Sequence, residues 1–200
     1  MRRLLLASLA SVAAVALTGA ADAAVITYAT DLNGPSESPP NASPGSGEAT
    51  VIVDDVLNTM RVEVSFVGLL GTTTASHIHC CTALADAGTA PVATQVPTFT
   101  GFPLGVTAGT YDHTFDLLLD STYNPSFEGA HGGTAATAEA ALLAGMAANE
   151  AYLNIHTTVV PGGEVRGFLR ATVPEPATWA TMILGLGLAG LSLRRRRVPA

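Results

Sequence analysis

A strict alternation of apolar and polar residues near the middle of the chain constrains the fold more than any other feature. Residues 60–66 read Met-Arg-Val-Glu-Val-Ser-Phe, with an apolar side chain at every second position. This period of two is typical of a β-strand that buries one face. The β-branched segment 48–55 precedes it, and Asn58-Thr59 predicts a turn between them, so we expect the two segments to form a hairpin.

Further short segments have the composition of strands and are separated by clusters of Gly, Pro and Ser. They are residues 25–30, 75–79, 111–119, 151–157 and 164–171. Such spacing predicts an all-β domain, an antiparallel β-sandwich or barrel with Greek-key-like connections.

Residues 134–149 interrupt this pattern. The segment is rich in alanine, and Leu142, Leu143 and Met146 recur at helical spacing. Alanine has the highest helix propensity, and the recurring apolar residues provide one face for packing. The segment therefore predicts one short helix that covers the sheet.

The N-terminal 23 residues have the features of a secretory signal peptide. Arg2 and Arg3 precede the apolar stretch 4–17, and Ala21-Asp22-Ala23 supplies the small residues of a cleavage site. We therefore expect residues 1–23 to be removed on export. Residues 24–172 are then long enough for one domain with its own core and too short for two.

The C-terminal segment 173–200 has the features of a membrane-inserted sorting signal. Pro174, Glu175 and Pro176 precede the apolar run 177–193, which ends at four basic residues, Arg194, Arg195, Arg196 and Arg197. A run of this length lies at the short limit for a membrane-spanning helix. The arginines favour a cytoplasmic C-terminal end, with everything before the helix outside. A buried core helix is the alternative, but four arginines have no use in a core.

This layout resembles the PEP-CTERM sorting signal of Gram-negative envelope proteins. The resemblance implies an exosortase-type processing enzyme as a partner, cleavage near the Pro-Glu-Pro, and an intermediate anchored in the inner membrane. It further implies delivery to the cell surface or to an extracellular matrix, with a link to exopolysaccharide and biofilm.

The body of the chain is strongly acidic. Residues 25–172 contain fourteen acidic residues, three arginines and no lysine. The resulting negative field repels nucleic acid and anionic lipid, so we expect neither as a partner of the mature domain. Acidity also keeps a secreted protein soluble, and by itself it identifies no ligand.

Two ordered motifs resemble the CHRD domain family, named after chordin. Residues 76–79 read Ser-His-Ile-His, and residues 151–157 lead through Pro161-Gly162-Gly163 into Glu-Val-Arg-Gly at 164–167. An early Gly-Pro-Ser-Glu-Ser-Pro at 34–39 accompanies them. The resemblance covers nearly the whole mature body, and it implies an all-β extracellular module whose biochemical activity is largely undefined.

Three histidines are the main candidates for a site. His77 and His79 share one face of the predicted strand 75–79, and His156 lies in the predicted strand 151–157. With the intervening isoleucines directed to the core, we expect the three imidazoles on the outer surface, where pairing of the two strands would bring them together.

Two interpretations of these histidines remain open. As an imidazole site, His77, His79 and His156 would bind copper or zinc, both of which accept neutral histidine nitrogen. The His-x-His pattern also resembles the copper strand of copper-zinc superoxide dismutases, which favours a β-sandwich and a metal. Alternatively, the histidines form hydrogen bonds with loop backbone and neighbouring polar side chains, and only hold the edges of the domain.

Cys80 and Cys81 follow His79 directly and are the only cysteines. An intrachain disulfide that closes a long loop is therefore impossible. Export through an oxidising compartment leaves a vicinal disulfide, a disulfide between chains, or thiolates that act as auxiliary ligands beside His79.

The sequence lacks the motifs of the common enzyme classes. There is no Gly-x-Ser-x-Gly, no Walker-type phosphate loop and no His-Glu-x-x-His. The serines and histidine of segment 121–131 lie in what we interpret as a connecting loop. We therefore expect a non-enzymatic structural or binding protein of the envelope or matrix; the alternative is a metal-binding or redox protein built on the histidines.

Overall fold

The computed structural model describes residues 25–172, and both predicted processing segments lie outside the described residues. The strands are β1 (Val25–Asn33), β2 (Ser46–Asp54), β3 (Thr59–Val67), β4 (Thr73–His79), β5 (Gly109–Asp116), β6 (Tyr152–Thr157), β7 (Val165–Phe168) and β8 (Arg170–Ala171). They form one sheet in the order β4-β6-β7-β1-β2-β3-β5, with β8 beside β1.

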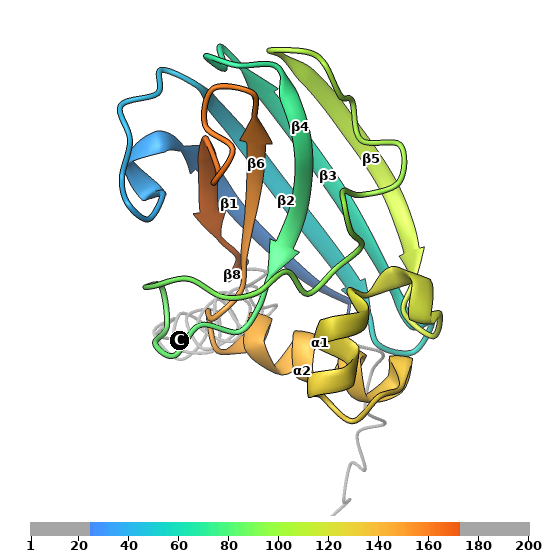
Figure 1. Ribbon diagram of the computed structural model, residues 1–200. Helices are drawn as coiled ribbons and strands as arrows, with labels where there is room; N and C mark the ends of the chain where they lie inside the picture. The colour runs from blue at the N-terminus through green and yellow to red at the C-terminus, as the bar shows by residue number, and fades with distance from the viewer. Residues whose placement is uncertain (1–24, 173–200) are drawn as a thin grey trace, which may run out of the picture.

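All strand pairs are antiparallel, and the sheet curls into a half-barrel (Figure 1). The predicted all-β antiparallel class is confirmed. The predicted hairpin is β2–β3, in which Val51 lies opposite Val62 and Asp54 opposite Thr59. The apolar set of the alternating segment is buried, as the period of two requires: Met60, Val62, Val64 and Phe66.

The last predicted strand, 164–171, is divided. Leu169 separates β7 from β8 and is fully buried, and its backbone N–H donates to the carbonyl of Ala151. The interruption allows the chain to leave β6 and pair with the start of β1. The period of the sequence does not reveal it, because both halves retain strand composition.

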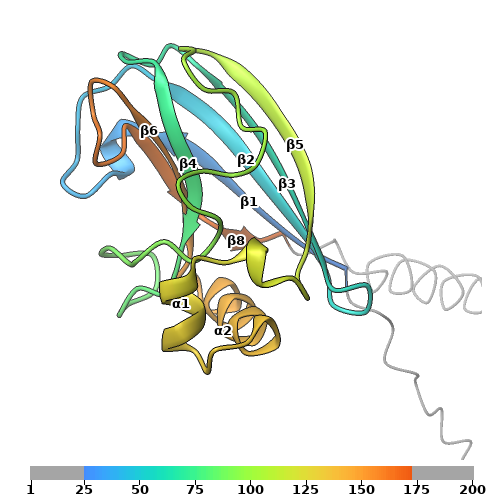
Figure 2. The ribbon, with the colours of Figure 1, turned by 45° about the vertical axis from the view of Figure 1, so that its right-hand side comes forward.

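Two α-helices lie across one end of the curled sheet (Figure 2). The predicted covering helix is α2 (Ala135–Ala147), which begins at a capping box between Thr134 and Thr137 and buries Leu142 and Met146. The second helix, α1 (Pro125–Ala130), lies where we expected a connecting loop, so that interpretation was wrong. Its signal is Asn124, whose side chain accepts from the N–H of Ser126, followed by proline at the first helical position.

Two short 3-10 turns, η1 (Gly34–Ser36) and η2 (Asp120–Thr122), complete the elements. The core lies between the concave face of the sheet, the helices and the long segment between β4 and β5, whose Phe99 and Phe102 are buried. Among residues 25–172, no helix is long and apolar enough to cross a membrane.

One row across the sheet positions the candidate site. His77 lies opposite Asn154, Asn154 opposite Arg166, and Arg166 opposite Asn33 at the end of β1. Residues in one row of a sheet point to the same face. The histidine strand, the centre of the sheet and the end of β1 therefore meet on the convex face.

The two ends of the described chain meet at the opposite end of β1. The N–H of Thr172 donates to the carbonyl of Thr27 over 2.7 Å, and the Thr172 hydroxyl donates to the same oxygen. The first and last strands are thus neighbours in the sheet.

Candidate metal centre

Three histidines meet where β4 pairs with β6. Ala75 lies opposite His156 and His77 opposite Asn154, so the alternation of the strands places His77, His79 and His156 on one face. One ring nitrogen from each lies within 4.8 Å of those of the other two. The structure thus brings together the three residues that the sequence singled out.

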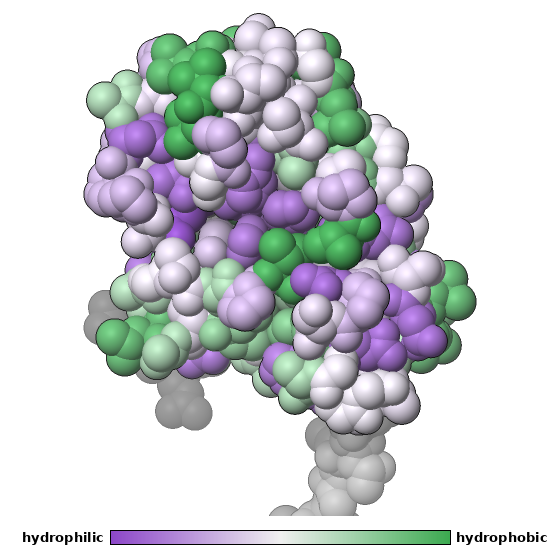
Figure 3. All heavy atoms as spheres, viewed as in Figure 1, coloured by the Kyte–Doolittle hydropathy of each residue, from purple (hydrophilic) through white to green (hydrophobic). Residues whose placement is uncertain are grey.

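The three imidazoles lie on the outer face of the sheet, opposite the core-facing isoleucines, but they are not exposed there. His77 is 6% and His79 9% exposed, and His156 is partly buried. The segment after β4 runs back beside that strand and covers its edge, with N–H groups of Ala93 and Phe99 donating to β4 carbonyls. Figure 3 shows hydrophilic side chains gathered in a hollow over β4 and β6.

Each imidazole donates one N–H to a backbone carbonyl. The pairs are His77 Nε2 with Pro97 O (3.1 Å), His79 Nδ1 with Ala90 O (2.8 Å) and His156 Nδ1 with Pro161 O (2.8 Å). Because a carbonyl only accepts, the hydrogen of each neutral ring is assigned to that nitrogen, and the second nitrogen carries a lone pair. Those second nitrogens are buried and have no partner among residues 25–172. Metal-binding histidines are held in the same way, with the outer N–H fixed by a carbonyl.

The surroundings keep the three rings neutral. Burial, together with the neighbouring His156 and His79, lowers the pKa of His77 to about 3. Burial also lowers the pKa of His79 and of His156. A neutral imidazole is the form that binds a metal, so no proton has to leave these rings at neutral pH.

The cluster suits a borderline metal. Three nitrogens at about 2.0–2.1 Å from one tetrahedral ion lie roughly 3.4 Å apart. The observed nitrogens lie up to 4.8 Å apart, so the rings would have to close by at most about 1.4 Å. An all-imidazole donor set fits copper or zinc better than magnesium or calcium, which prefer oxygen.

The two cysteines are linked to each other. Cys80 and Cys81 form a vicinal disulfide, and Cys80 is 1% exposed. A Cβ atom on Gly145 of α2 would lie 2.3 Å from both sulfurs, so the disulfide packs directly on the helix backbone. The sulfurs are bonded to each other and therefore offer no thiolate to an ion in the histidine cluster.

A buried carboxylate borders the histidines. Glu37 is 6% exposed, and burial raises its pKa to about 7 although the guanidinium of Arg166 lies 3.8 Å away. Sequence reasoning missed Glu37, because it precedes β6 by more than a hundred residues. The only signal was its place in the 34–39 motif of the CHRD resemblance.

Asn154 connects Glu37 to the histidines. Its side-chain amide lies close enough to His77 and His79 to counteract part of the lowering of their pKa. A Cβ atom on Gly163 would lie 2.6 Å from Glu37 Oε1 and 2.8 Å from Asn154 Nδ2. The two side chains therefore converge on the space that this glycine leaves open.

Aromatic and cationic side chains extend the site across the convex face. The rings of His79 and Tyr152 are stacked, the guanidinium of Arg166 lies 4.6 Å from the centre of the Tyr152 ring, and Phe168 meets Tyr152 edge-on. Arg166 also donates to the carbonyls of Ser36 and Gly88. The buried guanidinium of Arg166 therefore has both hydrogen-bond acceptors and an aromatic ring as partners.

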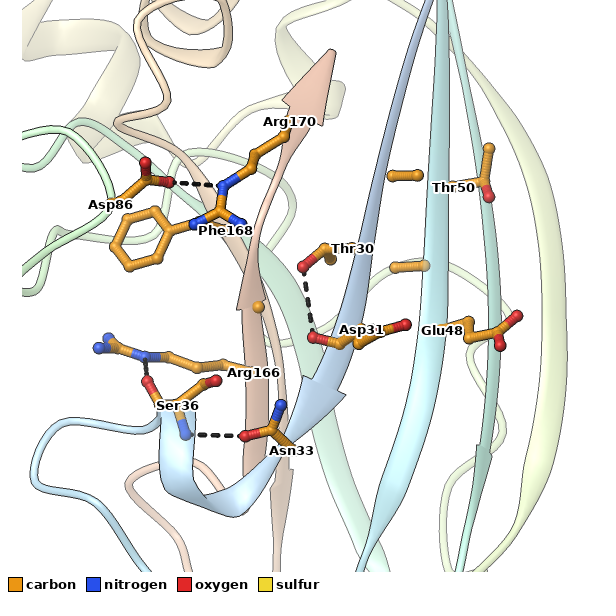
Figure 4. Close-up of a pocket in the computed structure, with 13 residues that line it drawn as sticks. Thr30, Asp31, Asn33, Ser36, Glu48, Thr50, Asp86, Arg166, Phe168 and Arg170 are labelled. Carbon is orange, nitrogen blue, oxygen red and sulfur yellow. Dashed lines mark hydrogen bonds and ion pairs between the residues drawn. The ribbon is translucent and has the colours of Figure 1, made fainter. Parts of the chain in front are cut away.

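Beside this stack lies a polar pocket of about 650 Å³ over β1, β2 and β7. Figure 4 shows the carboxylates of Asp31 and Glu48 on one side, and Phe168 with the Arg170–Asp86 ion pair on the other. The pocket shares Arg166 with the histidine side of the sheet.

Glu164, in the motif that follows Pro161-Gly162-Gly163, has a structural environment. It is fully buried and accepts from the hydroxyls of Ser43 and Thr157 and from the N–H groups of Leu70 and Gly71. Burial alone raises the pKa of Glu164, but these four hydrogen bonds outweigh it and the pKa falls below its usual value. The carboxylate joins three loops at one end of the sheet.

Two other polar side chains lie away from the cluster. Asp112 is bound by Arg61 on the exposed face of β3 and β5, and His131 donates to Phe127 O in α1. The sorting residues Pro174, Glu175 and Pro176 and the arginines at 194–197 lie outside the described residues.

Comparison with protein families gives two matches. The CHRD domain matches residues 28–169, and the PEP-CTERM protein-sorting motif matches residues 172–197. Comparison with curated proteins and with solved structures finds no match. The sorting motif implies export, a membrane-anchored intermediate and processing by an exosortase.

Proposed function

Since the chain belongs to the CHRD domain family and carries a PEP-CTERM protein-sorting motif, we propose that it is a surface protein whose domain binds copper or zinc through His77, His79 and His156. It is exported by its signal peptide from a Gram-negative cell and released from the inner membrane by an exosortase-type enzyme. It then acts in the envelope or in an exopolysaccharide matrix.

One observation carries the metal assignment. Three buried imidazole nitrogens, each on a ring whose other N–H is fixed by a carbonyl, have no hydrogen-bond partner among residues 25–172. The three rings lie together, with one nitrogen of each within 4.8 Å of those of the other two. Buried acceptors without a donor cost free energy, and a purely structural role for the histidines leaves that cost uncompensated. A metal ion satisfies all three lone pairs at once.

Metal content of residues 24–172, produced in the periplasm without a histidine tag and challenged with copper and zinc, tests the assignment. We expect one ion per chain by elemental mass spectrometry. The double variant His77→Gln, His79→Gln should lose the ion and remain folded, whereas His113→Gln, outside the cluster, should retain it. A metal-free protein whose melting temperature falls on His77→Gln would instead support a structural role.

The sorting assignment has its own test. Deletion of residues 173–200 removes the motif and leaves the described domain intact. We expect the truncated protein to be exported and no longer retained at the surface. Unchanged surface retention would refute the role of the tail.

Binding of matrix polysaccharide is the second candidate function. The pocket beside β1, β2 and β7 offers free carboxylates at Asp31 and Glu48 and the ring of Phe168. Carboxylates accept hydrogen bonds from sugar hydroxyls, and aromatic rings pack against sugar rings. Calorimetric titration with a neutral oligosaccharide, compared with Asp31→Asn and Glu48→Gln, would test this role.

A further inference from the structure

The buried side-chain atoms without a hydrogen-bond partner among residues 25–172 are concentrated at one place. They are Glu37 Oε1, His77 Nδ1, His79 Nε2, Asn154 Oδ1 and His156 Nε2. The three ring nitrogens are acceptors, because the hydrogen of each ring is used on its carbonyl. The amide oxygen of Asn154 is also an acceptor, and so is Glu37 Oε1 when the carboxyl is ionised. A metal ion bound only by the three imidazoles satisfies the ring nitrogens. It leaves the oxygens of Asn154 and Glu37 without a hydrogen-bond partner.

Those two oxygens belong to side chains that are neighbours. Asn154 lies opposite His77 in the β4–β6 ladder, and it is 2% exposed. Glu37 Oε1 and Asn154 Nδ2 both approach the space beside Gly163, so the carboxylate and the amide of these two side chains are neighbours. Oxygen acceptors in this position match the hydrogens of a water molecule.

We propose that the ion keeps one exchangeable water; this inference rests on the proposed metal function. The water donates one hydrogen bond to Asn154 Oδ1, and Glu37 Oε1 accepts a hydrogen bond from the same water network. The site then has an open coordination position that accepts small anionic ligands. Asn154 and Glu37 are positioning residues for the water and do not themselves bind the ion.

The absence of a fourth protein donor favours this arrangement. Structural zinc sites have four protein ligands, whereas sites that act on ligands have three and a water. The nearest candidates for a fourth donor were the cysteines, but their sulfurs are bonded to each other and packed on Gly145. Within residues 25–172 the metal-ligand cluster comprises the three histidines.

Azide titration of the copper-loaded protein tests the open position. In the wild type we expect a saturable azide-to-copper absorption band. Asn154→Leu should retain one copper per chain and bind azide about tenfold more tightly, since the displaced water has lost a hydrogen bond. Asn154→Asp keeps the acceptor and should not show this gain. His113→Gln, outside the cluster and outside the neighbouring pocket, should behave like the wild type.

The outcomes separate the two proposals. Copper binding without an azide band would overturn the open position and leave the metal function standing. No copper binding would overturn both. An unchanged azide affinity in Asn154→Leu would overturn the role of Asn154. If that variant does not fold, Glu37→Gln replaces it: loss of the negative charge should raise azide affinity, and unchanged affinity would count against the proposal.

Discussion

The ring of His79 lies parallel to the ring of Tyr152, its partner across the β4–β6 ladder, with 4.7 Å between centroids and 5° between planes. The two side chains also share a backbone group. Ala90 O accepts from His79 Nδ1, and the Tyr152 hydroxyl bonds with the N–H and the carbonyl of Ala90. The orientation of His79 is therefore fixed by stacking and by a common hydrogen-bond partner.

Tyr152→Phe should weaken metal binding while the stack survives. Removal of the hydroxyl frees Ala90, and loosening a group around a metal-binding histidine lowers metal affinity by about tenfold. Competition with a chromophoric chelator would measure the change. Tyr123→Phe is the matched control, because it removes a hydroxyl that bonds Leu117 O away from the cluster. Equal affinity in both variants would argue against the role of Ala90.

Gly163→Ala should damage the site where Gly162→Ala does not. A Cβ at position 163 collides with Glu37 and Asn154, and the backbone there has a φ of +128°, which disfavours a side chain. Nothing lies within 4 Å of a Cβ at position 162. We expect a loss of about 2 kcal/mol in the free energy of unfolding for Gly163→Ala and less than about 0.5 kcal/mol for Gly162→Ala. Urea unfolding would measure both, and similar losses would contradict the convergence of Glu37 and Asn154.

Glu164→Gln should destabilise the domain by about 3 kcal/mol, because an amide cannot accept all four hydrogen bonds of the buried carboxylate. The exposed Glu48→Gln provides the reference and should cost less than about 0.5 kcal/mol. A difference under about 1 kcal/mol between the two would indicate that the loops meet without the carboxylate.

The same carboxylate predicts an acid dependence. Its pKa is lowered in the folded state, so the unfolded chain takes up the proton first as the pH falls below about 4.5. The contribution of Glu164 to stability is therefore complete above that pH and is lost below it. Unfolding curves between pH 3 and 7 should show a smaller acid loss in Glu164→Gln than in the wild type; parallel curves would contradict the lowered pKa.

Gly145→Ala tests the packing of the vicinal disulfide on α2. Alanine normally favours a helix, but here its Cβ meets both sulfurs, so we expect a loss of about 1–3 kcal/mol. Gly129→Ala in α1 meets no atom within 4 Å and should stabilise by about 0.5–1 kcal/mol. Thermal unfolding of the oxidised protein distinguishes them. Stabilisation by both substitutions would place the disulfide away from the helix.

The sequence was most informative where a local period determined the structure. The alternation at 60–66 predicted β3 and its buried face, and the same period placed His77 and His79 on one face of β4. The sequence did not determine that β4 pairs with the strand of His156. The burial of these histidines could not be predicted, because it depends on the segment that folds back along β4. Glu37 and the partners of Glu164 are joined to the site only by tertiary contacts, which leave no local pattern.

The short hydrogen-bonded pair of Thr27 and Thr172 determines how the domain would be displayed during sorting. The described chain begins and ends near this pair, whereas the row that contains His77, Asn154 and Arg166 reaches β1 at Asn33. Six residues of β1 separate Thr27 from Asn33, which corresponds to about 20 Å along the strand. A chain still tethered by its tail would therefore hold the histidine hollow away from its attachment point.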